Sequence, residues 1–202
     1  QILNVSNHEV IPIGELGCYD EHGIFPINVL KYEDKIYAYL SGWSRRVSVS
    51  VETGIGLAMS YDNGKTFKRL GNGPVLTSSL SEPYLVVDGF VKNYDGIFHM
   101  WYIYGTDWTQ IDKSSEPERT YKIGHAISED GINWKKELKQ IISDSIEYEC
   151  QALPTVIKIK NRYHMYFAYR GTFDFRNNSN NAYKIGYAYS DDLITWIKKK
   201  KK

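Results

Sequence analysis

Internal repetition is the feature that most constrains the fold of this 202-residue chain. Three segments resemble one another: residues 54–67 (GIGLAMSYDNGKTF), 122–134 (KIGHAISEDGINW) and 184–196 (KIGYAYSDDLITW). Each has the pattern of a strand, a Ser-x-Asp turn and an aromatic residue that opens the next strand. The serines Ser60, Ser128 and Ser190 are 68 and 62 residues apart. A period of this kind indicates a repeat architecture.

A second repeated element precedes each of these segments. It covers residues 28–43, 89–105 and 155–171, and each copy has a strand, a polar turn and a strongly aromatic alternating strand. The two elements together give four strands in about 65 residues, three times over. Four-stranded units that stack on their neighbours are the blades of a β-propeller. Since no long window shows helical periodicity, we predict an all-β fold.

We expect one propeller domain over residues 1–197, with blades at about 14–76, 77–141 and 142–197, and a lysine tail at 198–202. Propellers usually have about four to eight blades. Three blades therefore suggest part of a larger ring.

Charge and apolar content exclude several other classes of protein. The chain has 25 basic and 24 acidic residues, and its formal charge of +1 becomes −4 when the five terminal lysines are set aside. Such a body does not favour nucleic-acid binding. The chain contains no apolar run of about 18 residues that would predict a membrane span.

Cys18 and Cys150 lie far apart, without a neighbouring metal-ligand pattern, so neither a disulfide framework nor a metal site is predicted. The first residue is Gln, and no signal peptide is visible, so localisation stays open.

Acidic residues recur at one register ahead of the aromatic strands. Asp20, Glu82 and Glu147 each precede by 17 residues the matched positions Tyr37, His99 and His164. Glu149 lies two residues after Glu147, on the same side of a strand, and competes with it for the same role. Because inner strands line the channel of a propeller, we expect Asp20, Glu82 and one of the two glutamates to converge within about 5 to 10 Å.

Converging carboxyl groups suit glycosidic bond cleavage. One carboxylic acid protonates the leaving oxygen, while another carboxylate activates water or attacks the sugar. The alternative interpretation is that these acids have no catalytic role and are solvated at strand ends or cap turns. Aromatic and polar residues at the predicted channel mouth would bind the sugar through ring stacking and hydroxyl contacts. These candidates are Trp43, Arg45, Asp107, Trp108, Tyr169 and Arg170.

With these residues, the chain resembles the five-bladed propeller glycosidases, the group that includes glycoside hydrolase families 43, 32, 68 and 130. The resemblance rests on residues 17–26 (GCYDEHGIFP), 81–91 (SEPYLVVDGFV) and 147–157 (EYECQALPTVI). It implies that Asp20 is the base or nucleophile and that Glu82 tunes pKa values. Glu149 is followed by Cys150, as in the Glu-Cys motif of β-fructosidases, which implies an acid role for Glu149.

The resemblance further implies a five-bladed ring that hydrolyses a glycan or oligosaccharide and requires no cofactor, although some relatives bind calcium in the channel. Glu at position 82 and the absence of an Asn-Asp-Pro motif depart from the group's pattern. A carbohydrate-binding propeller without catalysis is therefore an alternative. A phosphorylase would need a phosphate site, which Arg45 and Arg170 could supply. Residues 60–67 fit the Asp-box of sialidases, but the Arg-Ile-Pro segment of those enzymes is absent.

Overall fold

The computed structural model describes residues 5–199, apart from the side chain of Pro26. It contains three antiparallel sheets of four strands, each in chain order. The first sheet has β1 (Gly23–Tyr32), β2 (Lys35–Arg45), β3 (Val51–Ser60) and β4 (Lys68–Arg69). The second has β5 (Val86–Tyr94), β6 (Ile97–Thr109), β7 (Glu118–Ser128) and β8 (Lys135–Lys136). The third has β9 (Glu149–Ile159), β10 (Arg162–Gly171), β11 (Lys184–Ser190) and β12 (Ile197–Lys198). The prediction of four-stranded β-propeller blades is confirmed.

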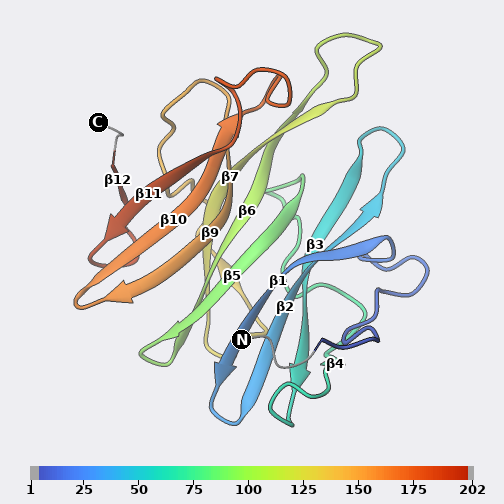
Figure 1. Cartoon of the computed structure of the whole chain (residues 1–202), viewed down its shortest axis with the longest axis vertical. Coiled ribbons are helices and arrows are strands. Elements are labelled where there is room, and N and C mark those ends of the chain that lie inside the picture. The colour runs from blue at the N-terminus through green and yellow to red at the C-terminus, as the bar shows by residue number, and fades with distance from the viewer. Residues whose placement is uncertain (1–4, 200–202) are drawn as a thin grey trace.

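The second sheet lies between the first and the third, so the three blades fan out side by side (Figure 1). Strand β5 contacts both β1 and β9, which identifies the first strand of each blade as the inner one. One core cluster, with Tyr39 and Met100, fills the space between blades one and two. Another, with Trp101 and Met165, fills the space between blades two and three. Much of the aromatic content therefore serves packing between blades.

The Ser-x-Asp segments form the hydrogen-bonded turns expected of them. Ser60 Oγ donates to Asp62 Oδ1 at 2.8 Å, and the amide of Thr66 donates to the same carboxylate at 2.9 Å. The turns at Asp130 and Asp192 repeat this pattern. Backbone amide donors lower the pKa of Asp62 and of Asp192 to about 2. These aspartates stabilise the turns that connect the third and fourth strands of each blade.

Each inner strand carries a β-bulge. The pairing register shifts between Ile24 and Ile27 in β1, between Val87 and Phe90 in β5, and opposite Tyr166 and Ala168 in β9. A bulge redirects the side chain at the extra residue and often lies next to a functional site. The three bulges therefore mark one corresponding position in the three blades.

Lys198 and Lys199 continue the third blade, although the sequence predicts a lysine tail from residue 198. Lys198 ends β12, and the amide of Lys199 donates to Tyr187 O at 3.0 Å. The last three lysines lie outside the described residues.

Cys18 and Cys150 are both free thiols. Within residues 5–199, no three His, Cys, Asp or Glu side chains form a cluster that could hold a metal ion. The same residues include no helix long and apolar enough to cross a membrane.

Candidate functional site

A pocket of about 640 Å³ is lined by residues from all three blades. Its volume lies within the range of about 300–1,000 Å³ that is typical of small-molecule sites. The walls are mainly apolar and aromatic, and Asp88 and Arg119 are the charged residues among those described. The lining comprises Phe25, Trp43, Val51, Thr53, Leu85, Val87, Asp88, Ile103, Arg119, Tyr121, Ala152, Leu153 and Tyr183. We call it the central pocket.

The inner-strand bulges supply corresponding residues to the central pocket. Phe25, Asp88 and Leu153 each lie at a bulge, and all three line the pocket. Asp88 and Leu153 have the left-handed φ values of 58° and 51°. A non-glycine residue in this region costs about 1–3 kcal/mol and persists only where its surroundings hold it. The bulges therefore place one carboxyl group and two apolar side chains at equivalent positions.

Blade one holds the backbone of β5 around Asp88. The amide of Asp88 donates to Ser41 Oγ at 3.0 Å, and the amide of Val86 donates to Thr53 Oγ1 at 3.0 Å. Further along β5, the amide of Val91 donates to an oxygen of Asn28 at 2.8 Å. These three hydrogen bonds satisfy amides that the bulge and the strand edge leave unpaired. They fix the direction in which the Asp88 side chain leaves the strand.

Burial raises the pKa of the Asp88 carboxyl to about 6, although a hydrogen bond from the Leu153 amide and the charge of Arg119 oppose the shift. Of the residues that the structure describes, Asp88 is the one carboxylate in the pocket lining. A carboxyl with a pKa near 6 is protonated often enough near neutral pH to act as a general acid. The geometry therefore offers a proton donor inside a largely apolar pocket.

Arg119 supplies a positive charge to the same pocket. Its Nη1 donates to Ser50 Oγ at 3.1 Å, and its guanidinium lies 5.8 Å from the ring centroid of Trp108. Trp43 itself lines the pocket and packs against His22, with ring centroids 5.7 Å apart. Of the predicted sugar-binding residues, Trp43 is thus in the lining, and Trp108 lies outside it, next to the guanidinium of Arg119.

Three of the four acids predicted from the sequence are paired with basic residues outside this lining. Each forms an ion pair with a residue of the outermost strand of its own blade. The pairs are Asp20 Oδ2 with Arg69 Nη2 at 2.5 Å, Glu82 Oε2 with Lys136 Nζ at 2.6 Å, and Glu149 Oε1 with Lys198 Nζ at 2.7 Å. All three carboxylates are almost fully buried. Their recurrence therefore has a structural explanation, and their catalytic role stays a prediction.

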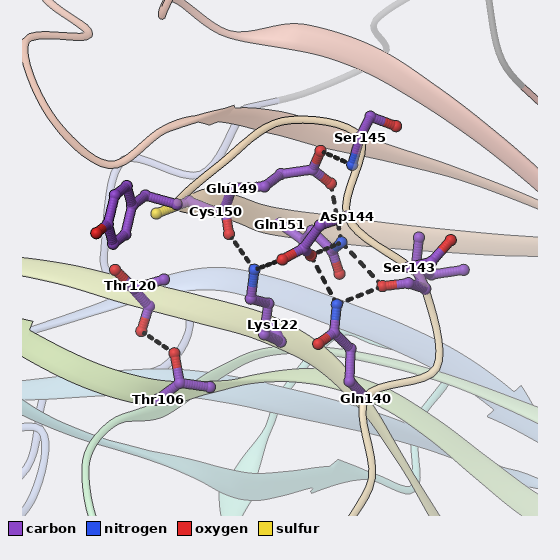
Figure 2. A network of polar contacts seen from close by, with 12 residues as sticks. Thr106, Thr120, Lys122, Gln140, Ser143, Asp144, Ser145, Glu149, Cys150 and Gln151 are labelled. Carbon is purple, nitrogen blue, oxygen red and sulfur yellow. Dashed lines mark hydrogen bonds and ion pairs between the residues drawn. The ribbon is translucent and has the colours of Figure 1, made fainter.

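Glu149 also belongs to a polar network between blades two and three (Figure 2). The amide of Ser145 donates to Glu149 Oε2 at 2.8 Å, and Gln151 Nε2 donates to Glu149 Oε1 at 2.9 Å. Lys122 of β7 donates to the backbone oxygen of Glu149 at 2.5 Å and pairs with Asp144 at 2.7 Å. Both carboxylate oxygens of Glu149 are thus occupied. Glu149 therefore joins the β8–β9 connection, through Ser145, to strand β9 and, through Lys122, to strand β7.

Glu147, the alternative acid, differs from Glu149 in burial and in partners. Its side chain is exposed and has no hydrogen bond or ion pair with residues 5–199. It lines a separate pocket with Tyr148 and Phe173. The structure therefore does not bring Glu147 and Glu149 to one site.

Tyr169, Arg45 and Asp107 also lie outside the lining of the central pocket. Arg45 and Asp107 are exposed at the ends of their strands. Tyr169 is half-buried, and Lys198 Nζ lies 5.0 Å from its ring centroid. Their role in sugar binding stays a prediction.

Arg170 lies behind the pocket wall. Its Nη1 donates to the carbonyl oxygens of Gly171 and Thr172, at 2.7 and 3.1 Å. Its guanidinium is 3.6 Å from the ring centroid of Phe175 and 5.3 Å from that of Tyr121, which lines the pocket. Aromatic rings and carbonyl groups therefore stabilise this buried cation. Arg170 supports the wall and is absent from the lining.

Neither Asp88 nor Arg119 is among the site residues predicted from the sequence. A signal for Asp88 does exist in the sequence: the dipeptides Phe25-Pro26, Asp88-Gly89 and Leu153-Pro154 recur at intervals of 63 and 65 residues. Proline and glycine inside a strand pattern often mark a bulge. Arg119 has no comparable signal, because its place in the pocket depends on how blade two packs against blade one.

No model of a known protein family matches the chain. An uncharacterized protein of Mycobacterium tuberculosis is 28% identical over 203 residues, which cover 97% of this chain and 61% of that protein. A β-1,2-mannobiose phosphorylase of Thermoanaerobacter is 30% identical over 137 residues, covering 63% of this chain and 43% of that enzyme. The chain thus spans about three fifths or less of the length of these relatives.

Solved structures with a similar fold include carbohydrate-active enzymes. A thermostable family-43 glycoside hydrolase has a TM-score of 0.66 at 19% identity and covers 91% of this chain and 56% of its own. A family-32 β-fructofuranosidase of Bombyx mori has a TM-score of 0.66 at 15% identity, covering 88% and 36%. A structure described for family-130 glycoside hydrolases that target β-1,2 mannosidic linkages has a TM-score of 0.63 at 16% identity, covering 91% and 50%. The chain therefore has the β-propeller fold of the glycosidase and phosphorylase group that its sequence resembles.

Proposed function

We propose that this chain forms the catalytic region of a carbohydrate-active enzyme that cleaves a glycosidic bond in the central pocket, with Asp88 as the proton donor. The observation that carries this proposal is the position of Asp88 at the β5 bulge, inside the pocket, with its pKa raised to about 6 by burial. The similar folds of glycoside hydrolases and the partial similarity to a mannobiose phosphorylase support it.

The chemistry needs a proton at the leaving oxygen as the glycosidic bond breaks. The protonated Asp88 carboxyl can supply it, and such general acid catalysis is worth about 10²- to 10⁴-fold in rate. Trp43 and Tyr183 line the pocket and offer aromatic surface to the apolar face of a sugar ring. The apolar walls exclude water and strengthen electrostatic interactions inside.

Hydrolysis by the two-carboxylate mechanism needs a second carboxylate on the opposite side of the sugar. The described lining contains one carboxylate and one cation, Arg119. This composition favours a second candidate, phosphorolysis, in which inorganic phosphate attacks the sugar and Arg119 stabilises the phosphate charge. The sugar then leaves as a sugar phosphate, and the proton of Asp88 goes to the departing hydroxyl group. The partial similarity to the Thermoanaerobacter β-1,2-mannobiose phosphorylase supports this candidate.

The test measures cleavage of β-1,2-mannobiose and of a panel of aryl glycosides, each with and without inorganic phosphate. We expect Asp88→Asn to lower kcat/KM by about 10²- to 10⁴-fold. Asp95→Asn is the matched control, because Asp95 is an exposed acid in the β5–β6 turn, outside the pocket lining, and asparagine tolerates its positive φ. A sugar phosphate among the products identifies phosphorolysis, and free sugar alone identifies hydrolysis. Equal turnover by Asp88→Asn and wild type would overturn the assignment, and no cleavage of any substrate would favour the binding-only alternative.

A further inference from the structure

A second pocket, of about 310 Å³, lies between the segment that precedes β9 and the β10–β11 loop. Its lining includes Glu147, Tyr148, Phe173, Asn180 and Asn181. The volume lies at the lower end of the range of about 300–1,000 Å³ for small-molecule sites. We call it the Tyr148 pocket. It is separate from the central pocket, with which it shares no lining residue.

Tyr148 is held in a strained conformation with its side chain toward solvent. Its φ is 50°, in the left-handed region, and 57% of the residue is exposed. The buried Thr172 bonds the Tyr148 carbonyl oxygen twice, through its amide at 3.0 Å and its Oγ1 at 2.7 Å. Positive φ at a bulky residue costs about 1–3 kcal/mol and clusters at functional sites. The backbone strain at Tyr148 thus destabilises the fold, while the aromatic side chain stays exposed.

The corresponding dipeptide in blade one behaves differently. Tyr19-Asp20 and Tyr148-Glu149 both place a tyrosine before the acid that pairs with the outermost strand. Tyr19 packs over the glycines of β2 and β3, and its hydroxyl is buried. In blade three the tyrosine instead leaves the sheet and lies against Phe173, with ring centroids 5.5 Å apart at 66°. Packing of the blade therefore does not require an exposed Tyr148.

Polar groups free to bind a ligand surround this ring. Glu147 is exposed and has no hydrogen bond or ion pair within residues 5–199, and the Asn180 side-chain amide likewise has no partner in that range. An aromatic ring beside a carboxylate and an amide matches the two surfaces of a sugar, one apolar and one rich in hydroxyl groups. A neighbouring free carboxylate disfavours an anionic ligand. We propose that the Tyr148 pocket is a second carbohydrate-binding site, which takes a neutral sugar ring on Tyr148 and bonds its hydroxyl groups through Glu147 and Asn180.

One loop connects this site with the central pocket. Phe173 and Asn181 line the Tyr148 pocket, and Tyr183, at the end of the same β10–β11 connection, lines the central pocket. Asn181 Nδ2 donates to Phe173 O at 3.1 Å and closes the loop on itself. The β10–β11 connection therefore contributes residues to both pockets. Binding at the Tyr148 pocket does not depend on cleavage at Asp88.

The test titrates ¹⁵N-labelled protein carrying Asp88→Asn with β-1,2-mannobiose and with methyl glycosides of mannose, glucose and galactose. We expect amide shifts at residues 147–149 and 171–173 for at least one of these sugars. Tyr148→Gly should weaken that binding at least tenfold while leaving Tm unchanged or higher, because glycine accepts a positive φ without strain. Tyr166→Ala is the matched control, since Tyr166 is also 52% exposed but lies outside the pocket.

Absence of these shifts with every sugar, or equal binding by Tyr148→Gly, would overturn the second site. So would a large fall in Tm on Tyr148→Gly together with unchanged binding, because it would make the tyrosine structural. Shifts confined to residues near Asp88 and Leu153 would support the central pocket and reject the second site. One titration thus reports separately on sugar binding at the central pocket and at the Tyr148 pocket.

Discussion

Lys198 Nζ lies 2.7 Å from Glu149 Oε1, and this buried pair joins the outermost strand of blade three to the first residue of its inner strand. In the other two blades, Arg69 pairs with Asp20 and Lys136 with Glu82, which lie a few residues before the inner strands. Strands one and four are at opposite edges of each sheet. The ion pair therefore fastens the segment that enters a blade to the strand that completes it.

Removing one partner of such a pair leaves a buried charge without compensation, which typically costs about 3–5 kcal/mol. We therefore expect Glu149→Gln and Lys198→Met each to lower the free energy of unfolding by about this amount, as measured by urea denaturation. The double variant should lose less than the sum of the two. Arg162→Gln is the control, because Arg162 and Asp191 form an exposed pair of a kind worth about 0–1 kcal/mol.

The same variants examine the catalytic role that the sequence suggested for Glu149. If Glu149 is structural, Glu149→Gln keeps its turnover per folded molecule. A variant with wild-type stability and no turnover would instead support the catalytic assignment and count against our interpretation of the pair.

The pH dependence of cleavage should follow the protonation of Asp88. A general acid works in its protonated form, and burial raises the pKa of Asp88 to about 6. We expect kcat/KM to fall as pH rises through about 6, by tenfold for each further pH unit while this group controls the rate. A pH–rate profile between pH 4 and pH 9 measures it. An unchanged profile across this range would exclude Asp88 as the acid.

The free energy of unfolding should depend on the protonation of Asp88 in the same direction as the cleavage rate. Because the folded pKa lies above the ordinary value of 3.8, the folded state binds more protons than the unfolded state between these two values. Stability from this group is therefore present at low pH and is lost as pH rises from about 4 to about 6, by an amount on the order of 3 kcal/mol. Asp88→Asn should remove this slope, which denaturant titrations at a series of pH values would detect.

The blade architecture could be predicted from the sequence because it repeats. Strand alternation, the Ser-x-Asp turns and the aromatic second strands recur at a steady interval, and each is a local property. The third blade was predicted to end before Lys198, because a lysine run resembles a solvated tail. The burial of the Lys198 side chain against Glu149 depends on a contact over 49 residues, which local pattern does not reveal.

The site was harder to predict than the fold, because its residues come together through contacts between segments that are far apart in the sequence. Equal spacing identified Asp20 and Glu82, but spacing alone does not separate an inherited ion pair from a catalytic acid. Asp88 lies in a bulge, where the strand alternation that predicts side-chain direction breaks down. The raised pKa of Asp88 depends on burial by neighbouring blades, and burial is a property of the assembled sheets.

The histidines between blades two and three should make the fold sensitive to acid. His99 Nδ1 and His125 Nε2 lie 3.0 Å apart, and His125 Nδ1 is 3.1 Å from Glu137 Oε1. Burial lowers the pKa of His99 to about 4 and also lowers that of His125. Glu137 and Asp95 oppose the shift at His99, while Lys139 near Glu137 favours a neutral His125.

Because these histidines have folded pKa values below the ordinary 6.5, the unfolded chain binds more protons as pH falls below that value. Stability is thus present above about 6.5 and is lost as pH falls toward 4. We expect His99→Phe, which keeps an aromatic ring beside Trp101, to reduce the loss of Tm between pH 7 and pH 4.5 by at least about 2–4 °C. His8→Gln, an exposed histidine, is the control. Parallel Tm curves for all three proteins would contradict this account.

Close packing of Tyr19 on the glycines of blade one gives a final prediction. A Cβ added at Gly56 would overlap the Tyr19 hydroxyl and lie 2.9 Å from its Cζ atom, whereas one added at Gly71 would meet nothing within 4 Å. Overpacking of this kind costs about 1–3 kcal/mol. We expect Gly56→Ala to lower the free energy of unfolding by that amount and Gly71→Ala to leave it nearly unchanged.

Tyr19→Phe distinguishes this overlap from any destabilisation by alanine in β3 that does not involve the Tyr19 hydroxyl. The Tyr19 hydroxyl is buried without a hydrogen-bond partner among the described residues, so removing it alone should cost little. In the Gly56→Ala background, the same change removes the overlapping atom and should restore part of the lost stability. Urea denaturation of the two single variants and the double variant gives the interaction free energy. Strictly additive effects would show that Tyr19 does not pack on Gly56 as the structure places it.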